Sequence, residues 1–166
     1  KSLPKNGQVK ISAFKGFVDG VISAHTAAMI EPYADSPETR GTPVFTQDKL
    51  DELVLRANKA GFPVALHSIG DQGVRMALNS FEKSKDKLKH SLWNRVEHIE
   101  VMNSEDAARF GSLKLVASVQ PGHMYFSSAH SSYYPTRLGT KRLAHAFPWK
   151  ELLNGGALLV FGSDFP

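Results

Sequence analysis

The chain has 166 residues, of which 42% are hydrophobic and 22% are charged, which is the balance of one globular domain with a sizeable core. The net charge of +4 is small, and the basic stretch at residues 83–89 carries no interleaved aromatic residues, so a nucleic-acid partner is not expected. Cysteine is absent, which excludes disulfides and thiolate metal sites, and no apolar run reaches the ~20 residues of a membrane span. We therefore expect a cytoplasmic protein that binds neither nucleic acid nor membrane.

Strands and helices are expected to alternate along the chain. A first strand is expected between Gln8 and Gly20, with Lys15 inside it, and a proline-rich loop follows at residues 21–45. Thr46 is a good N-cap for a helix that Gly61 ends. The later expectations are a buried strand over 64–67, a helix capped by Asp71, a strand over 94–99, a helix over 104–111, a strand over 115–120, a loop over 122–146, a helix over 147–153 and a last strand from Ala157.

This order of elements predicts the fold class. Strands that alternate with helices form a parallel sheet with right-handed crossovers. Five strands are too few to close a barrel of eight. We expect an α/β fold, a partial TIM (β/α)8 barrel, in which residues 1–166 form one incomplete barrel domain.

Polar residues recur where the expected strands end. His67, His98, Gln120 and Asp164 each stand at or just after the end of a short expected strand. The carboxyl ends of parallel strands are where α/β enzymes place their chemistry, and imidazole and carboxylate suit zinc or a similar ion. The alternative is that each histidine is a structural residue held by hydrogen bonds. The recurrence of the pattern favours a metal site.

Five motifs resemble those of a known family. They are Lys15-Gly16-Phe17-Val18-Asp19-Gly20, His67-Ser68-Ile69-Gly70-Asp71, Arg95-Val96-Glu97-His98, Val119-Gln120-Pro121-Gly122-His123 and Gly162-Ser163-Asp164-Phe165-Pro166. Their types and order resemble the amidohydrolase superfamily in its amidohydrolase 3 branch, the branch of N-substituted formamide deformylase-like enzymes. The resemblance covers the C-terminal part of such a barrel, and it implies that these strands are the fourth to the eighth.

The resemblance also implies a ligand set. Lys15 would be a carboxylated lysine that bridges metals, and His67 and His98 would be ligands on the next two strands. Asp164 would bind metal and take the proton from the attacking water. An unmodified lysine repels a metal ion, so the alternative is that Lys15 is a strand-end lysine that extends its charge into solvent. Lys10 is a less favoured candidate for the carboxylated lysine.

Substrate contacts are expected from the same end of the sheet. Gln120 and His123 would hold the carbonyl or acyl end of the substrate, or would only pack their loop. Asp19 would line the site or form a turn with Gly20. An apolar lid could come from Tyr125, Phe126, Tyr133 and Tyr134.

The sequence departs from the family in one important respect. The family's first-strand His-x-His pair and its small β-domain are absent, so we expect a fragment with at most part of a binuclear site. The expected activity is hydrolysis of an amide C–N bond, N-acyl or N-formyl, by water that one or two divalent ions, zinc first, activate. The alternatives are a barrel hydrolase for esters or cyclic amides, and a truncated binding or assembly module. The expected partners are a small-molecule amide, and either another copy of the chain or the rest of the barrel.

Overall fold

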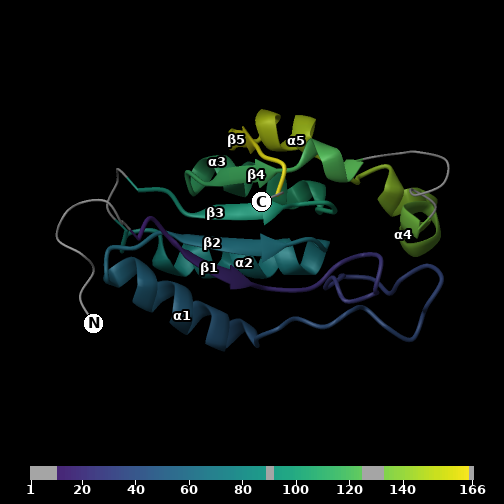
Figure 1. The fold of residues 1–166 in the computed structure, drawn as a ribbon, viewed down its shortest axis with the longest axis horizontal. Helices are drawn as coiled ribbons and strands as arrows, with labels where there is room; N and C mark the ends of the chain where they lie inside the picture. The colour runs from purple at the N-terminus through teal and green to yellow at the C-terminus, as the bar shows by residue number, and fades with distance from the viewer. Residues whose placement is uncertain (1–10, 89–91, 125–132, 165–166) are drawn as a thin grey trace.

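One parallel sheet organises the chain (Figure 1). The computed structural model describes residues 11–88, 92–124 and 133–164. Its strands pair in sequence order, each parallel to the next. They are β1 (Phe14–Phe17), β2 (Val64–Ser68), β3 (Arg95–His98), β4 (Val116–Val119) and β5 (Leu158–Phe161). The structure thus confirms the α/β class and the arrangement of a partial barrel, and it places the carboxyl ends of all strands at one end of the sheet.

The first two crossover helices begin close to the expected positions. α1 (Gln47–Lys59) starts after Thr46, whose hydroxyl accepts a hydrogen bond from the Lys49 backbone N–H at 3.4 Å. α2 (Asp71–Ser84) has Gly70 as its N-cap, so the expectation that Asp71 caps this helix is wrong. From inside the first turn, the Asp71 carboxylate accepts from the backbone N–H of Gln72 at 2.9 Å and from that of Ile30 at 2.8 Å, which ties the helix start to the loop after β1.

The later crossovers are shorter. A 3-10 turn η1 (Ser104–Asp106) leads into α3 (Ala107–Ser112), and α5 (Trp149–Asn154) precedes β5. The expectation of a loop over 122–146 is wrong, because this segment contains η2 (Pro121–Met124) and α4 (Tyr133–Leu143). The sequence of α4 has little hydrophobic periodicity, because only Tyr134 and Leu138 are buried and Gly139 breaks the helical backbone.

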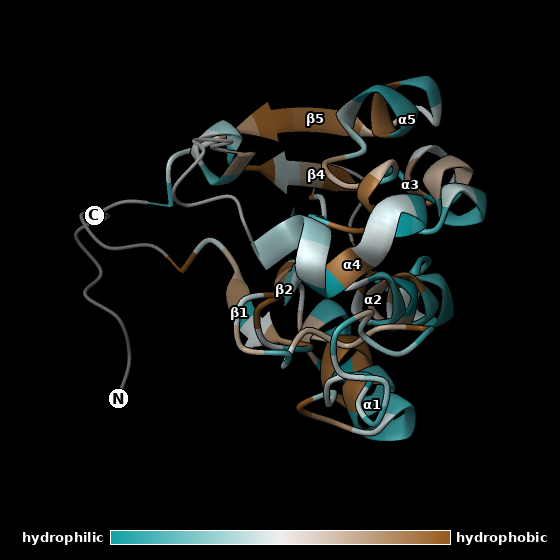
Figure 2. Cartoon of the chain, turned by 90° about the vertical axis from the view of Figure 1, so that its right-hand side faces the viewer, coloured by the Kyte–Doolittle hydropathy of each residue, from teal (hydrophilic) through white to brown (hydrophobic). Residues whose placement is uncertain are grey.

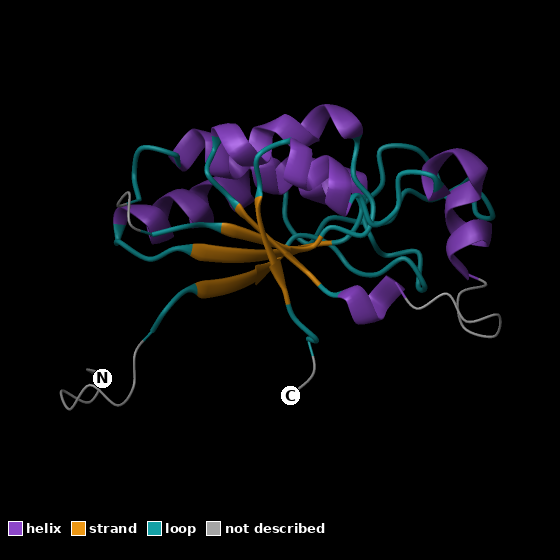
Figure 3. Cartoon of the chain, turned by 90° about the horizontal axis from the view of Figure 1, so that it is seen from above, coloured by secondary structure: helices purple, strands orange, loops and turns teal. Residues whose placement is uncertain are grey.

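The core lies between the sheet and one layer of helices (Figure 3). The expected stripe of α2, namely Val74, Ala77, Leu78 and Phe81, is almost fully buried there. It packs against alternate residues of the strands, such as Leu66, Val96 and Ala117. None of the helices in the described ranges is long and apolar enough to cross a membrane.

The other face of the sheet is open in the described part of the chain. Phe17, Leu158 and Val160 are 53%, 49% and 43% exposed, although all three are apolar. Figure 2 shows β5 as a hydrophobic strand at the margin of the molecule. Within the described ranges, β1 pairs only with β2 and β5 only with β4. This is the geometry of a barrel wall whose inner face and two edges are uncovered.

Candidate metal and substrate site

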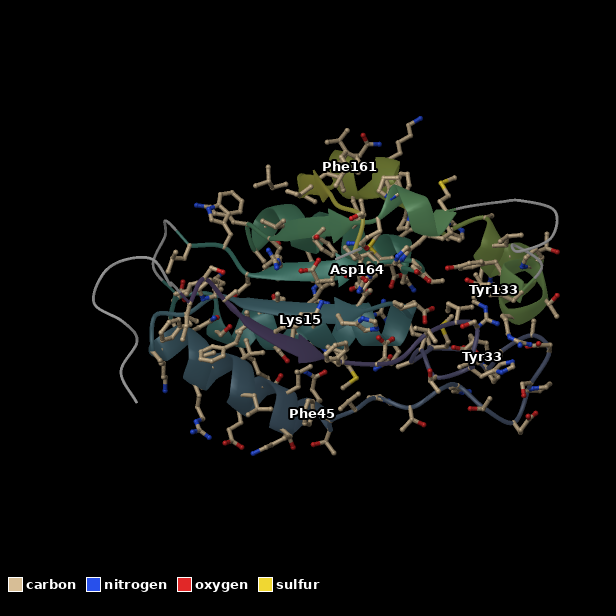
Figure 4. All side chains as sticks on the ribbon, in the orientation of Figure 1. Lys15, Tyr33, Phe45, Tyr133, Phe161 and Asp164 are labelled. Atoms are coloured by element: carbon tan, nitrogen blue, oxygen red, sulfur yellow. The ribbon has the colours of Figure 1, made fainter. Side chains whose placement is uncertain are left out.

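A cavity of about 640 Å³ lies at the carboxyl ends of the strands. All four residues expected to bind metal line it, namely Lys15, His67, His98 and Asp164. Figure 4 shows Lys15 and Asp164 over the middle of the sheet, although one lies on β1 and the other follows β5. The structure therefore brings together side chains from both edges of the sheet.

His67 is held in one tautomer. Its Nε2 lies 3.0 Å from the carbonyl oxygen of Gly20, and a carbonyl can only accept, so Nε2 carries the proton. Nδ1 is then left with a lone pair. Burial lowers the pKa of His67, the hydrogen bond to Gly20 opposes this, and the positive charge of Lys15 adds to the lowering. The neutral imidazole that results is the form that binds a metal ion.

His98 is held in the complementary way. Its Nδ1 donates to the side-chain oxygen of Gln120 at 2.8 Å, which leaves Nε2 with a lone pair. Burial lowers the pKa of His98, and the neighbouring His67 and Lys15 lower it further. A second group that fixes the orientation of a ligating histidine is a regular feature of metal sites.

The backbone turns His98 towards His67. Ser68 and His98 are paired across the sheet, so strict alternation would direct His98 with Ser68 and away from His67. His98 and Ile99 have φ values of 78° and 53°, which end the strand. The two imidazole rings consequently meet with their centroids 4.5 Å apart. Positive φ is uncommon outside glycine, and at such a position it often marks a functional site.

Lys15 and Asp164 complete the group of charges. The Lys15 ammonium lies 5.5 Å from the centre of the Phe17 ring, and its charge lowers the pKa of both histidines. The negative charge of the Asp164 carboxylate acts to raise the pKa of both His67 and His98. Lys10, the alternative lysine, lies outside the described residues.

The fit to a metal ion can be tested on donor chemistry. Two imidazoles with free lone pairs, and a carboxylate, suit a divalent ion such as zinc. In the described ranges, no three His, Cys, Asp or Glu side chains are arranged to hold an ion by themselves. Carboxylation of Lys15 would add an anionic oxygen where the chain now has a cation. The residues therefore fit part of a metal site.

The two substrate contacts expected after β4 differ in position: Gln120 directly precedes η2, and His123 lies within it. Gln120 is buried with its amide directed at His98, whereas His123 lines the cavity. The His123 ring is stacked on that of His98 at 5.7 Å with an interplanar angle of 9°. Its Nδ1 lies 3.3 Å from Glu100 Oε1, a hydrogen bond that raises the pKa of His123 against the effect of burial.

Asp19 lies behind the histidines. Its carboxylate is buried and accepts from the backbone N–H groups of Ala28, Ile69 and Gly70 at 2.9–3.0 Å. Burial raises the pKa of Asp19 to about 7, although these hydrogen bonds act to lower it. Its Oδ1 is 3.8 Å from His67 Nε2. The Asp19 carboxylate therefore joins the loop after β1 to the end of β2, and Asp19 is not among the residues that line the cavity.

One acidic residue of the cavity, Glu100, was missed by sequence reasoning. Glu100 is buried two positions after His98 and accepts a hydrogen bond from the Tyr134 hydroxyl at 2.6 Å. An acidic residue two positions after a strand-end histidine was the available signal. Tyr133 and Tyr134 line the cavity, as a lid would require, whereas Tyr125 and Phe126 lie outside the described residues.

The loop after β1 and helix α4 are fastened together beside the cavity. Arg137 pairs with Asp35, and its second nitrogen donates to the Ser23 carbonyl at 3.3 Å. Arg142 donates to the carbonyl oxygens of Glu31 and Pro32 at 2.8 and 2.6 Å. Segments more than a hundred residues apart in sequence thus form one wall.

A parallel barrel wall with histidines and a carboxylate at its carboxyl end is an arrangement that suits a metal-dependent barrel enzyme. Comparison with protein families agrees, because residues 1–166 match the description "Amidohydrolase family" along their whole length. The chain belongs to this family.

Individual relatives give the same result. A putative amidohydrolase, YtcJ, of Bacillus subtilis is 34% identical over 158 residues, which are 95% of this chain and 29% of that protein. An N-substituted formamide deformylase of Arthrobacter pascens is 22% identical over 98% of this chain and 29% of its own length. A metal-dependent hydrolase of Pyrococcus horikoshii superposes with a TM-score of 0.79 at 31% identity, covering 92% of this chain and 29% of that one. The chain thus spans less than a third of each relative.

Proposed function

We propose that the protein carrying this chain hydrolyses a non-peptide amide C–N bond, N-acyl or N-formyl, by metal-activated water. The observation that carries the proposal is the pair His67 and His98. Each has one ring nitrogen bound to an oxygen acceptor and the other left for a ligand, and both line one cavity with Asp164. A divalent ion held there, with zinc as first candidate, supplies ionisation of water near neutral pH and polarisation of a carbonyl.

The residues divide the remaining work. His67 and His98 would hold the ion through Nδ1 and Nε2 respectively, and Lys15 would join them if it were carboxylated. The Asp164 carboxylate would also hold the ion, and it would take a proton from the attacking water and deliver it to the leaving nitrogen. His123, which lines the cavity, contacts the acyl end of the substrate, and Gln120 acts by fixing His98.

The substrate class rests on chemistry and on one relative. The Arthrobacter relative is named as a deformylase of N-substituted formamides, which are amides of the proposed type. A hydrolase for esters or cyclic amides would use the same residues, so the alternatives differ in substrate shape. A non-catalytic binding or assembly module remains the alternative from another class, since the exposed Phe17, Leu158 and Val160 offer an apolar surface.

Location and partners complete the proposal. We place the protein in the cytoplasm, and we expect the open edges of β1 and β5 to pair with further barrel strands or with another copy of the chain. Small amides are the expected ligands, and the mild charge of +4 gives no reason to expect nucleic acid.

A substrate panel tests the proposal. The natural full-length protein, loaded with zinc, should release amine from N-formyl or N-acyl amines faster than it cleaves matched esters and cyclic amides. His98→Ala should abolish this activity together with metal content. Preferred cleavage of esters or cyclic amides would support the alternative hydrolase. Absence of turnover on every substrate, with metal bound, would overturn the enzymatic proposal.

A further inference from the structure

Glu100 is the buried acid of the cavity for which the proposed reaction has no role. It follows β3, and its side chain is only 7% exposed. A buried carboxylate is costly unless it is hydrogen-bonded or paired. Both of its oxygens are engaged, Oε2 by the Tyr134 hydroxyl at 2.6 Å and Oε1 by His123 Nδ1 at 3.3 Å.

The three partners come from different segments. Glu100 lies just past β3, His123 belongs to η2 after β4, and Tyr134 belongs to α4. Tyr134 is itself fixed, because it is 4% exposed and its ring packs against those of Tyr133 and Phe147 at 4.6 and 5.2 Å. The chain of contacts therefore runs from a rigid anchor in α4 to an imidazole at the cavity.

The position of the His123 ring is determined on two sides. Its plane is set by stacking on His98, and its Nδ1 is set by the acceptor Glu100. A carboxylate can only accept, so Nδ1 carries a proton in this arrangement. Nε2 is left for a partner in the cavity that His123 lines.

We propose that Tyr134 and Glu100 are positioning residues that hold His123, so that its Nε2 contacts the polar end of the substrate beside His98. The proposal rests on the proposed function for the identity of the substrate as an amide. It adds Glu100 and Tyr134 to the site, and it assigns the proton of His123 to Nδ1, so that Nε2 is the acceptor. Neither Glu100 nor Tyr134 is assigned contact with the reacting atoms.

The test uses the full-length protein and two readouts. At a pH where the imidazole is neutral, ¹⁵N NMR of labelled histidine should show His123 mainly as the Nδ1–H tautomer, with His123→Asn identifying the signal. Glu100→Gln should shift this tautomer balance and reduce kcat/KM for the amide by about 10–100-fold, with metal content unchanged. Tyr134→Phe should act in the same direction with a smaller effect, because it removes one hydrogen bond to the carboxylate.

Glu97→Gln is the matched control. Glu97 is a buried glutamate on β3 itself, and it pairs with Arg95 at 2.6 Å, outside the lining of this cavity. Its replacement should leave the His123 tautomer unchanged, whatever it does to stability. If Glu100→Gln does not fold, Tyr134→Phe decides by the same readouts.

The outcomes separate the two proposals. A wild-type protein with no turnover overturns the proposed function, and the tautomer measurement still decides the role of Glu100. Turnover in the wild type with an unchanged tautomer and unchanged kcat/KM in Glu100→Gln and Tyr134→Phe overturns the positioning role. Equal tautomer shifts in Glu97→Gln would also overturn it, because the effect would then be a general one of burial.

Discussion

His98 Nδ1 lies 2.8 Å from Gln120 Oε1, a hydrogen bond that joins the ends of β3 and β4. The bond determines which nitrogen of His98 is free, and therefore whether the ring can bind a metal ion from the cavity. Gln120 was expected to hold substrate, and this contact gives its side chain a different partner. Loss of such a second contact to a ligating histidine typically lowers metal affinity or activity by about 10–100-fold.

Gln120→Leu should weaken metal binding by about 10–100-fold, because the leucine cannot accept the proton of His98 Nδ1. Gln120→Glu keeps an acceptor and should retain most of the affinity. Competition with a chelator, followed by metal analysis, measures the effect. Gln72→Leu, which lies outside the lining of the cavity, is the control. Equal metal affinity in wild type and Gln120→Leu would show that the hydrogen bond does not matter.

Replacement of the proposed ligands should separate binding from turnover. His67→Ala or His98→Ala should lose metal and activity together, since each removes a nitrogen donor. Asp164→Asn should lower kcat more than it raises KM, because the amide cannot take the proton of the attacking water. Metal content and steady-state kinetics of the full-length protein measure both effects. Full activity in Asp164→Asn would remove the proton-transfer role from that residue.

Gly73→Ala should destabilise the protein, although alanine in a helix usually stabilises by about 0.5–1 kcal/mol over glycine. A Cβ at Gly73 would lie 2.4 Å from Oδ2 of Asp19, the carboxylate that holds three backbone amides. We expect a loss of about 1–3 kcal/mol in the free energy of unfolding. Gly122→Ala is the control, because its Cβ would meet nothing within 4 Å. Urea unfolding compares the two, and a stabilised Gly73→Ala would contradict the packing argument.

Asp51 should contribute stability that depends on pH. Burial acts to raise its pKa, but hydrogen bonds from Lys83, Ser80 and Gln47 outweigh it and hold the pKa below the ordinary 3.8. A depressed pKa in the folded state means that this stability is present above pH 3.8 and is lost as the pH falls through the folded value.

Asp51→Asn should therefore be less stable than wild type at pH 7, by about 1–2 kcal/mol, and the difference should shrink towards pH 3. Urea unfolding at several pH values measures it. Asp86→Asn, at an exposed position, is the control. A stability difference that stays constant from pH 7 to pH 3 would rule out the ionised form of Asp51 as its source.

The main elements of the fold were predictable because local signals agree with the tertiary structure. Thr46 and Gly61 mark the ends of α1, and the stripe from Val74 to Phe81 has helical spacing. His67 ends the strand expected from the sequence, and in the structure it is the last residue but one of β2, which ends at Ser68. The carboxyl ends of successive parallel strands lie at one end of the sheet, so topology predicts that Lys15, His67 and Asp164 come near one another, whereas His98 joins them only through its positive φ.

The remaining features depend on contacts that no local pattern contains. α4 was missed because it buries only Tyr134 and Leu138. The hydrogen bond from Tyr134 to Glu100 could not be predicted either, because Tyr134 belongs to this helix. The role of Asp19 depends on amides at positions 28, 69 and 70, which only the folded chain brings together. The positive φ at His98 is likewise a tertiary outcome, because sequence alternation would send the side chain to the other face.

A polypeptide limited to residues 1–166 should self-associate and show no amidase activity. Leu158 and Val160 are 49% and 43% exposed on the open face of β5, and an unpaired strand edge recruits partners. Its metal binding should be weak, because no three His, Cys, Asp or Glu side chains in the described ranges are arranged around one point. Leu158→Gln combined with Val160→Gln should reduce association, whereas Leu153→Gln, at a 61% exposed position on α5, should not. Analytical ultracentrifugation and metal analysis test these expectations, and a monomer that binds two ions and turns over an N-acyl amine would refute them.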